Sequence, residues 1–208
     1  MHSPIVKIIV LGDAGVGKTS LLEQYVNRRF AHSYKATIGM DFYSKNIKIG
    51  KRRVTVQLWD TAGMERFQSL GSSFFRGSDG VVLTYDVTNR NSLKSLEQWK
   101  DDFLIQSCPS NPEKFPIAVV GNKIDRSDRQ ITVKQAEKFC IEHGDLPHFE
   151  VSVMKAVNVD EAIEHIIEKS LENLPEEEEF SFVSNKFNLH AKREQGFFRR
   201  YFSKCSFL

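Results

Sequence analysis

Apolar residues along the chain fall into short continuous runs and into two alternating segments. The continuous runs, rich in Val and Ile, cover residues 5–11, 80–83 and 117–120. Runs of this length and composition are typical of strands buried on both faces of a parallel sheet. Residues 46–49 and 53–58 alternate apolar and polar positions on either side of Gly50-Lys51, which predicts an antiparallel hairpin with one face toward the core.

Helical periodicity fills the intervals between these strands. Thr132 with Gln135 predicts a capping box at the start of one helix. Asn158 with Glu161 predicts a similar start for another helix, which ends before Pro175. The apolar stripe of that last helix consists of Val159, Ala162, Ile163, Ile166, Ile167 and Leu171. A third helix is predicted by Leu93, Leu96, Trp99 and Phe103.

Strands that alternate with helices predict an open α/β sheet, whose ligand-binding loops lie at the carboxyl ends of the strands. The hairpin makes the sheet mixed. Composition changes at Pro175, where four consecutive glutamates (176–179) precede a polar stretch and a basic, aromatic end. We therefore predict a domain over residues 1–174 and a flexible tail over 175–208.

Composition narrows the choice of partners and compartments. A formal net charge of +2 gives no strong basic field, so we expect no nucleic-acid partner. Three scattered cysteines, Cys108, Cys140 and Cys205, do not make a disulfide framework and favour a reducing compartment. The start Met1-His2 does not resemble a signal peptide, and no apolar run approaches the roughly 20 residues of a membrane span. Any membrane contact is therefore expected through an anchor.

A glycine-rich segment directly follows the first predicted strand. Residues 12–19, Gly-Asp-Ala-Gly-Val-Gly-Lys-Thr, match the phosphate-binding pattern G-x-x-x-x-G-K-[ST]. Glycines let the backbone wrap around phosphate oxygens, Lys18 can reach the outer phosphates, and the Thr19 hydroxyl can ligate Mg²⁺. The alternative is a chance glycine-rich loop before a helix. The predicted nucleotide contacts of this segment are Gly15, Val16, Gly17, Lys18, Thr19 and Ser20.

A second motif follows the strand at 117–120 and predicts the base. Asn122, Lys123 and Asp125 form the pattern N-K-x-D. A carboxylate there can accept from both the N1–H and the exocyclic amine of guanine, whereas adenine lacks the N1–H and would leave it partly unpaired. The alternative is an ordinary polar turn. Together with the phosphate loop, the motif favours GTP and GDP over ATP.

The two motifs and five segments between them resemble the Rab family of the Ras superfamily. These segments are Thr37–Phe42, Leu58–Gly63, Glu65–Phe67, Phe74–Ser78 and Tyr85–Thr88. Residues 116–125 and 149–152 are most similar to the late-endosomal and vacuolar branch. The resemblance covers about residues 5–174 and implies a P-loop small GTPase fold, with a mixed six-stranded sheet that is mostly parallel and has one antiparallel edge strand, flanked by helices.

The resemblance also implies site residues. Phe30 would lie against the guanine ring, and Thr37 would join Thr19 and Asp60 around Mg²⁺ when a γ-phosphate is present. The N–H of Gly63 would contact that phosphate. Taken alone, Phe30 could be a core aromatic and Thr37 a plain loop residue. Ser152, Val153 and Met154 stand where the family has Ser-Ala-Lys. The backbone contact with the guanine O6 would remain, but we expect the bulkier Val153 and the missing Lys stem to weaken nucleotide binding.

The chain departs from the family at the catalytic position. Met64 stands where the family has the Gln that orients the attacking water. A thioether is a weak acceptor and no donor, so we predict slow intrinsic hydrolysis. Phosphoryl transfer here would depend on Met64, Gly63, Thr37 and Lys18. In the family, the activating protein can supply both an Arg and a Gln, so the switch need not be locked. The alternative is that Met64 is a surface hydrophobe and catalysis is intact.

The end of the chain predicts a lipid anchor. Residues 205–208, Cys-Ser-Phe-Leu, form a C-a-a-X ending whose final Leu favours a geranylgeranyl group on Cys205. A single prenyl chain anchors weakly, and residues 192–208 offer five basic residues against one acidic residue as a second signal. The alternative is a solvated tail with an unmodified cysteine.

These features predict a GTP/GDP switch that binds and hydrolyses GTP and recruits effectors in vesicle trafficking. It would work at the cytoplasmic face of endosomal or vacuolar membranes and cycle with the cytosol. Its expected partners are effector proteins, an exchange factor, a GTPase-activating protein and a prenyl-binding chaperone. The alternative, kept open by Met64, is a largely GTP-locked scaffold with little turnover.

Overall fold

The computed structural model describes residues 3–31, 36–37, 39–62 and 74–174. Their strands are β1 (Ile5–Leu11), β2 (Met40–Ile49), β3 (Arg52–Thr61), β4 (Gly80–Asp86), β5 (Ile117–Asn122) and β6 (His148–Glu150). The helices are α1 (Lys18–Asn27), α3 (Arg90–Ser107), α4 (Val133–Glu142) and α5 (Val159–Glu172), with a short 3₁₀ helix η2 (Pro112–Lys114). The strands form one sheet in the order β2-β3-β1-β4-β5-β6.

The sheet confirms the predicted mixed α/β architecture. β2 pairs antiparallel with β3 at one edge, and the other neighbouring strands are parallel. Every residue of β4 and β5 is buried, as their continuous apolar runs predict. The hairpin turns at Gly50, whose φ of 56° suits a residue without a side chain. Its strands extend beyond the alternating segments, because paired backbone groups continue to Met40 and Thr61.

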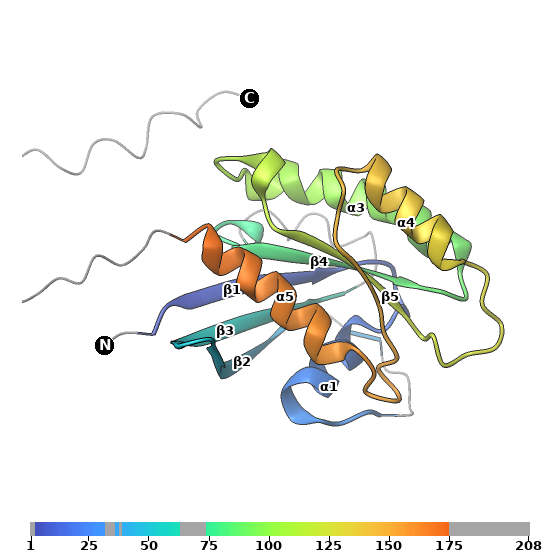
Figure 1. Cartoon of the computed structure of the whole chain (residues 1–208), viewed down its shortest axis with the longest axis horizontal. Coiled ribbons are helices and arrows are strands. Elements are labelled where there is room, and N and C mark those ends of the chain that lie inside the picture. The colour runs from blue at the N-terminus through green and yellow to red at the C-terminus, as the bar shows by residue number, and fades with distance from the viewer. Residues whose placement is uncertain (1–2, 32–35, 38, 63–73, 175–208) are drawn as a thin grey trace, which may run out of the picture. The chain divides into compact units, whose positions relative to one another are not determined.

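Helices cover both faces of the sheet (Figure 1). α1 and α5 lie on one face and α3 and α4 on the other, each pair over its own apolar cluster. All six predicted stripe residues of α5 are buried. On α3, Leu93, Leu96 and Phe103 are buried and Trp99 is partly buried against the same cluster. The helical periodicity therefore identified the faces that meet the sheet.

One of the two predicted helix starts is correct and the other is wrong in its mechanism. Thr132 and Gln135 form a capping box. Asn158 precedes α5 but makes no side-chain cap; its backbone is left-handed, with φ 57°. Its amide Nδ2 instead donates to the carbonyl of Glu150 at 2.9 Å and so closes the preceding loop. Acidic residues in the first turn, Asp160 and Glu161, complement the N-terminus of α5.

Because β1, β3, β4 and β5 are parallel, the loops that follow them lie together where the carboxyl ends of these strands meet, along one edge of the sheet. This edge carries the predicted phosphate loop and base-reading motif. In the described part of the chain, no helix has both the length and the apolar character needed to cross a membrane. The predicted tail, 175–208, and Cys205 within it lie outside the described residues, and so do Gly63 and Met64.

Candidate nucleotide-binding site

Two glycines of the phosphate loop are required by close approaches of other chain segments. A Cβ on Gly12 would lie 2.1 Å from the carbonyl oxygen of Thr84, and one on Gly17 would lie 2.4 Å from the Asn122 amide. Both glycines also have a positive φ, 139° and 102°. Gly17 begins α1 without a side-chain cap, so no side chain competes for the first N–H groups of that helix. Free N–H groups at a helix start suit an anion such as phosphate.

Lys18 lies inside this loop rather than on its surface. It is 5% exposed, and its Nζ donates to the carbonyls of Gly12 at 2.8 Å and Asp13 at 2.9 Å. Burial lowers the pKa of Lys18 to about 8, although the carboxylates of Asp60 and Asp13 act in the opposite direction. The hydrogen bonds hold a buried cation at the loop, where phosphate charge would offset its desolvation.

Three oxygen-bearing side chains meet beside Lys18. The Thr19 hydroxyl donates to Asp60 Oδ2 at 2.6 Å and lies 2.7 Å from the Thr37 hydroxyl. Asp60 is fully buried, and among the described residues its other oxygen, Oδ1, has no hydrogen-bond partner. Burial raises the pKa of Asp60, while the Thr19 hydroxyl and the Lys18 ammonium lower it. The structure therefore brings together the three predicted metal ligands.

These residues fit Mg²⁺. The ion prefers hard oxygen ligands and is usually held by one or two carboxylates together with substrate phosphates. One buried carboxylate with a free oxygen and two hydroxyls supply such a partial set. Over the described ranges, no three His, Cys, Asp or Glu side chains cluster as a metal site, so a cage made of protein carboxylates is absent there.

Asn122 joins the base-reading motif to the phosphate loop. Its Nδ2 donates to the carbonyl of Val16 at 2.9 Å. Its Oδ1 accepts from the backbone N–H groups of Lys123 at 2.7 Å and Val153 at 3.3 Å. The side chain is 3% exposed. Although Asn122 was predicted as a nucleotide contact, the hydrogen bonds of its side chain connect three segments of the protein around the site.

Lys123 makes a second connection of the same kind. Its Nζ donates to the carbonyl of Gly15 at 2.7 Å and pairs with Asp86 at 2.6 Å. The other Asp86 oxygen, Oδ1, accepts from the Thr88 backbone and hydroxyl at 2.8 and 2.7 Å. No role was predicted for Asp86. A carboxylate two residues before a threonine, at the end of a buried strand, is the signal that could have identified it as a turn anchor.

Asp125 lies at the other end of the site. Its Oδ1 accepts from the Ser152 hydroxyl, and Ser152 Oγ in turn accepts from the Lys155 backbone at 3.1 Å. The Val153 side chain is 1% exposed and belongs to the core, and the weaker nucleotide binding expected from its bulk stays a prediction. Met154 is 45% exposed. The Ser152–Val153 backbone thus stands beside the carboxylate predicted to read the base.

The remaining predicted residues divide between the described and undescribed parts of the chain. Phe30 is partly buried against the core cluster under α1 and α5, and Ser20 lies in the first turn of α1. A contact absent from the sequence analysis is the hydrogen bond from Trp99 Nε1 to Asp13 Oδ1, 2.8 Å, which ties α3 to the phosphate loop. Because it joins residues 86 positions apart, no local pattern could have revealed it.

Known proteins match this chain along most of its length. The Ras family model matches residues 7–172. The Ypt/Rab-type GTPase avaA of Emericella nidulans is 50% identical over 193 residues, which cover 92% of this chain and 94% of that protein. The Ypt/Rab-type GTPase ypt7 of Schizosaccharomyces pombe is 51% identical over 172 residues, 82% of this chain and 84% of the relative. The Ras-related protein Rab7 of Drosophila melanogaster is 46% identical over 191 residues, 92% of each.

The match spans both motifs and the strands and helices that position them. With its phosphate loop, its buried Lys18 and its base-reading motif brought to one edge of the sheet, this chain belongs to the Ras family, and within it to the Ypt/Rab-type GTPases.

Proposed function

We propose that this chain is a GTP/GDP switch of vesicle trafficking, which hydrolyses GTP and works at endosomal or vacuolar membranes. The observation that carries the proposal is the Asn122 side chain, which bonds the phosphate loop at Val16 and the base-proximal backbone at Val153. One rigid site thereby recognises both ends of a guanine nucleotide.

The base end of the site supplies specificity. The Asp125 carboxylate accepts the N1–H and amine of guanine, and the Ser152 hydroxyl orients it. Phe30 covers one face of the ring. The backbone of Ser152, Val153 and Met154 faces the guanine O6. Adenine would leave the carboxylate partly unpaired, and that penalty excludes ATP.

The phosphate end supplies charge and positioning. Lys18 and the backbone N–H groups of residues 15–20 hold the phosphates. Thr19, Thr37 and Asp60 are the residues that would hold Mg²⁺, which when bound neutralises charge on the outer phosphates. Gly63 and Met64 would lie next to the γ-phosphate. Phosphoryl transfer needs little covalent work from the protein, so this set suffices for slow hydrolysis.

Switching follows from the γ-phosphate, which Thr37 senses from a segment outside the regular elements. Effectors read the GTP state, an exchange factor reloads the site, and an activating protein speeds hydrolysis. A prenyl group on Cys205, delivered by a prenyl-binding chaperone, would supply the membrane anchor. The GTP-locked scaffold is not favoured, because the Emericella and Schizosaccharomyces relatives are named as GTPases.

The first test concerns the base. Asp125→Asn replaces an acceptor by an amide that can donate to the extra carbonyl of xanthine, so we expect a preference for XTP over GTP. Competition of GTP, XTP and ATP for the purified protein measures it. Ser152→Ala is the matched variant: it removes the orienting hydroxyl, keeps Asp125, and should weaken guanine binding without inverting the preference. If Asp125→Asn still prefers GTP strongly, the assignment fails.

The second test concerns the metal. Chelation of Mg²⁺ should accelerate release of a fluorescent GDP, because Lys18 alone would then balance the phosphate charge. The acceleration should be much smaller in Asp60→Asn, which has already lost the metal's carboxylate. A release rate in the parent protein that is indifferent to chelation would remove Mg²⁺ from the proposal.

A further inference from the structure

An ion pair connects the end of α1 to the start of α5. Arg28 Nη1 donates to both carboxylate oxygens of Asp160 at 2.7 Å, across a separation of 132 residues. The side chains are 56% and 45% exposed, so the pair lies at the surface. None of the predicted nucleotide contacts includes either residue. The pair joins the segment that leads to Phe30 with the helix that follows the loop of Ser152 and Val153.

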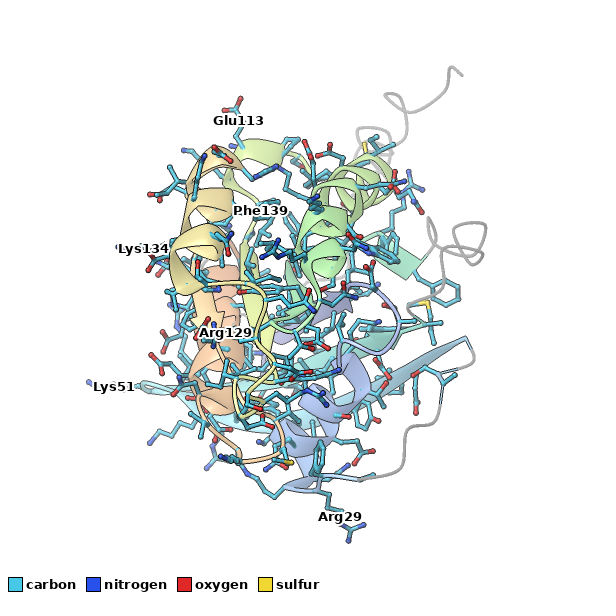
Figure 2. The ribbon with its side chains drawn as sticks, turned by 90° about the vertical axis from the view of Figure 1, so that its right-hand side faces the viewer. Arg29, Lys51, Glu113, Arg129, Lys134 and Phe139 are labelled. Carbon is cyan, nitrogen blue, oxygen red and sulfur yellow. The ribbon has the colours of Figure 1, made fainter. Side chains whose placement is uncertain are left out.

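Arg28 ends α1, two residues before Phe30. It caps α1 in the left-handed conformation, with φ 55°, and its backbone N–H donates to the carbonyl of Gln24 at 3.2 Å. Arg29 extends away from the body of the protein (Figure 2), and Phe30 then packs on the core. The conformation of the Arg28 backbone therefore determines the direction in which the chain leaves α1 toward Phe30.

The last turn of α1 is held from a second side. Lys45 Nζ donates to the carbonyl of Tyr25 at 2.7 Å and lies 3.9 Å from the centre of its ring. Tyr25 is fully buried. This contact anchors the turn before Arg28 to β2, so the ion pair is the connection that extends the anchoring toward Phe30.

Asp160 adjoins the second segment proposed to flank the base. It is in the first turn of α5, directly after the loop that carries Ser152 and Val153. That loop is closed by two backbone hydrogen bonds between Ser152 and Val157, of 3.2 and 2.9 Å. The Asn158 amide ties its end to Glu150. Asp160 is thus held in fixed relation to the backbone that faces the guanine O6.

We propose that Arg28 and Asp160 are positioning residues that hold Phe30 and the Ser152–Val153 backbone together around guanine, and so slow the release of nucleotide. This inference rests on the proposed function, because the pair can act only if those segments flank the base. Opening the pair removes no side chain that contacts the nucleotide, but it lets the segment with Phe30 move away from the base more often. GDP and GTP release should both accelerate.

The experiment measures release of fluorescent GDP from the Mg²⁺-loaded full chain. Arg28→Ala and Asp160→Ala should each accelerate release about two- to fivefold, the range for an exposed ion pair. The double variant should be no faster than the faster single variant. The Asp160 carboxylate also stabilises the positive N-terminus of α5. The comparison of the two single variants with the double variant is therefore needed to isolate the effect of the ion pair. The effect of Arg28→Ala should shrink in about 1 M salt, which screens exposed charges.

Two further variants separate positioning from general stability. Lys169→Ala breaks an exposed pair with Glu172, 2.9 Å, at the far end of the same helix, and should leave release unchanged. In a Phe30→Ala background, Arg28→Ala should add no acceleration, because its effect passes through Phe30. Additive effects of Arg28→Ala and Asp160→Ala, or release rates equal to the parent's, would overturn the inference. Failure of the parent to bind guanine nucleotides would instead overturn the proposed function.

Discussion

Asn122 makes hydrogen bonds to Val16, Lys123 and Val153, and each bond stabilises a different part of the nucleotide site. At the scale of the residue, these bonds are important because a buried amide left without partners lowers the stability of the protein more than an exposed one does. The same amide requires a glycine at position 17, because it occupies the space that a Cβ would need. The strictness of the glycine pattern therefore reflects the packing of two motifs against each other, in addition to the approach of phosphate.

A prediction at this scale concerns Met64. Met64→Gln should speed single-turnover GTP hydrolysis by about tenfold or more, because the amide can accept from and donate around the attacking water. Intrinsic turnover with Gln present is only on the order of 10⁻⁴ s⁻¹ in Ras, and tenfold corresponds to about 1.4 kcal/mol in the barrier. Phosphate release from preloaded GTP at saturating Mg²⁺ measures the rate. Met64→Leu, an apolar control, should stay slow, and equal rates for the parent and Met64→Gln would mean that another group places the water.

At the scale of the element, the packing of β4, β5 and β6 places an aromatic pair under the base-reading motif. Tyr85 stacks on His148 with ring centres 6.0 Å apart, and its hydroxyl lies 3.0 Å from His148 Nε2. Gly121 makes room for this, because a Cβ there would lie 2.4 Å from the Tyr85 hydroxyl oxygen. Arg129, labelled in Figure 2, pairs with Glu150 on β6 at 2.5 Å. These side chains therefore add to the backbone pairing with β5 that holds the last strand in the sheet.

This packing predicts a pH dependence of stability. Burial lowers the pKa of His148, although Glu150 acts in the opposite direction. Below about pH 6.5, the usual pKa of histidine, the unfolded state binds more protons at this site than the folded state. The free energy of unfolding should therefore fall as pH falls through about 6.5 toward the lowered pKa of the folded protein.

His148→Phe keeps an aromatic ring at this position and removes the titrating group. Chemical denaturation of the nucleotide-saturated protein at about pH 7.5 and 5.5 should show a smaller loss of stability in this variant than in the parent. Other acidic groups titrate in both proteins, so only the difference between the two losses reports on His148. Equal losses would mean that His148 binds protons equally in the folded and unfolded states.

At the scale of the whole molecule, the proposed nucleotide site lies at the carboxyl ends of the parallel strands. Recognition thus draws on loops separated by more than a hundred residues, as in the 106-residue separation between Val16 and Asn122. Such a site loses its geometry if the sheet order changes. The proposed function at a membrane would depend in addition on the predicted tail, 175–208.

A prediction at this scale concerns that tail. Mass spectrometry of the protein from its native cell should find one geranylgeranyl group on Cys205, as the final Leu favours. Cys205→Ser should move the protein from the membrane fraction to the soluble fraction, while Cys108→Ser, at an exposed cysteine of the described domain, should not. An unmodified Cys205 in the membrane fraction would leave only the basic and aromatic residues as the source of membrane binding.

The amino-acid sequence by itself determined the sheet and the helical faces, and it named the residues of the proposed site. Apolar runs specify buried strands, helical periodicity specifies the covered faces, and the two nucleotide motifs are local patterns whose chemistry can be read from residue types. These features depend on neighbours in the chain, which is why they could be predicted from residues 5–171 before any contact was known.

Only the tertiary structure decided how side chains from distant segments meet. It turned Asn158 away from α5 toward Glu150, buried Val153 in the core and paired Arg28 with Asp160. Each of these outcomes depends on which segments are adjacent after folding, and short-range propensity carries no information about that. The physical reason is that hydrogen bonds, ion pairs and core contacts all need their groups within a few ångströms of each other, and the packing of the whole chain decides which distant groups come that close.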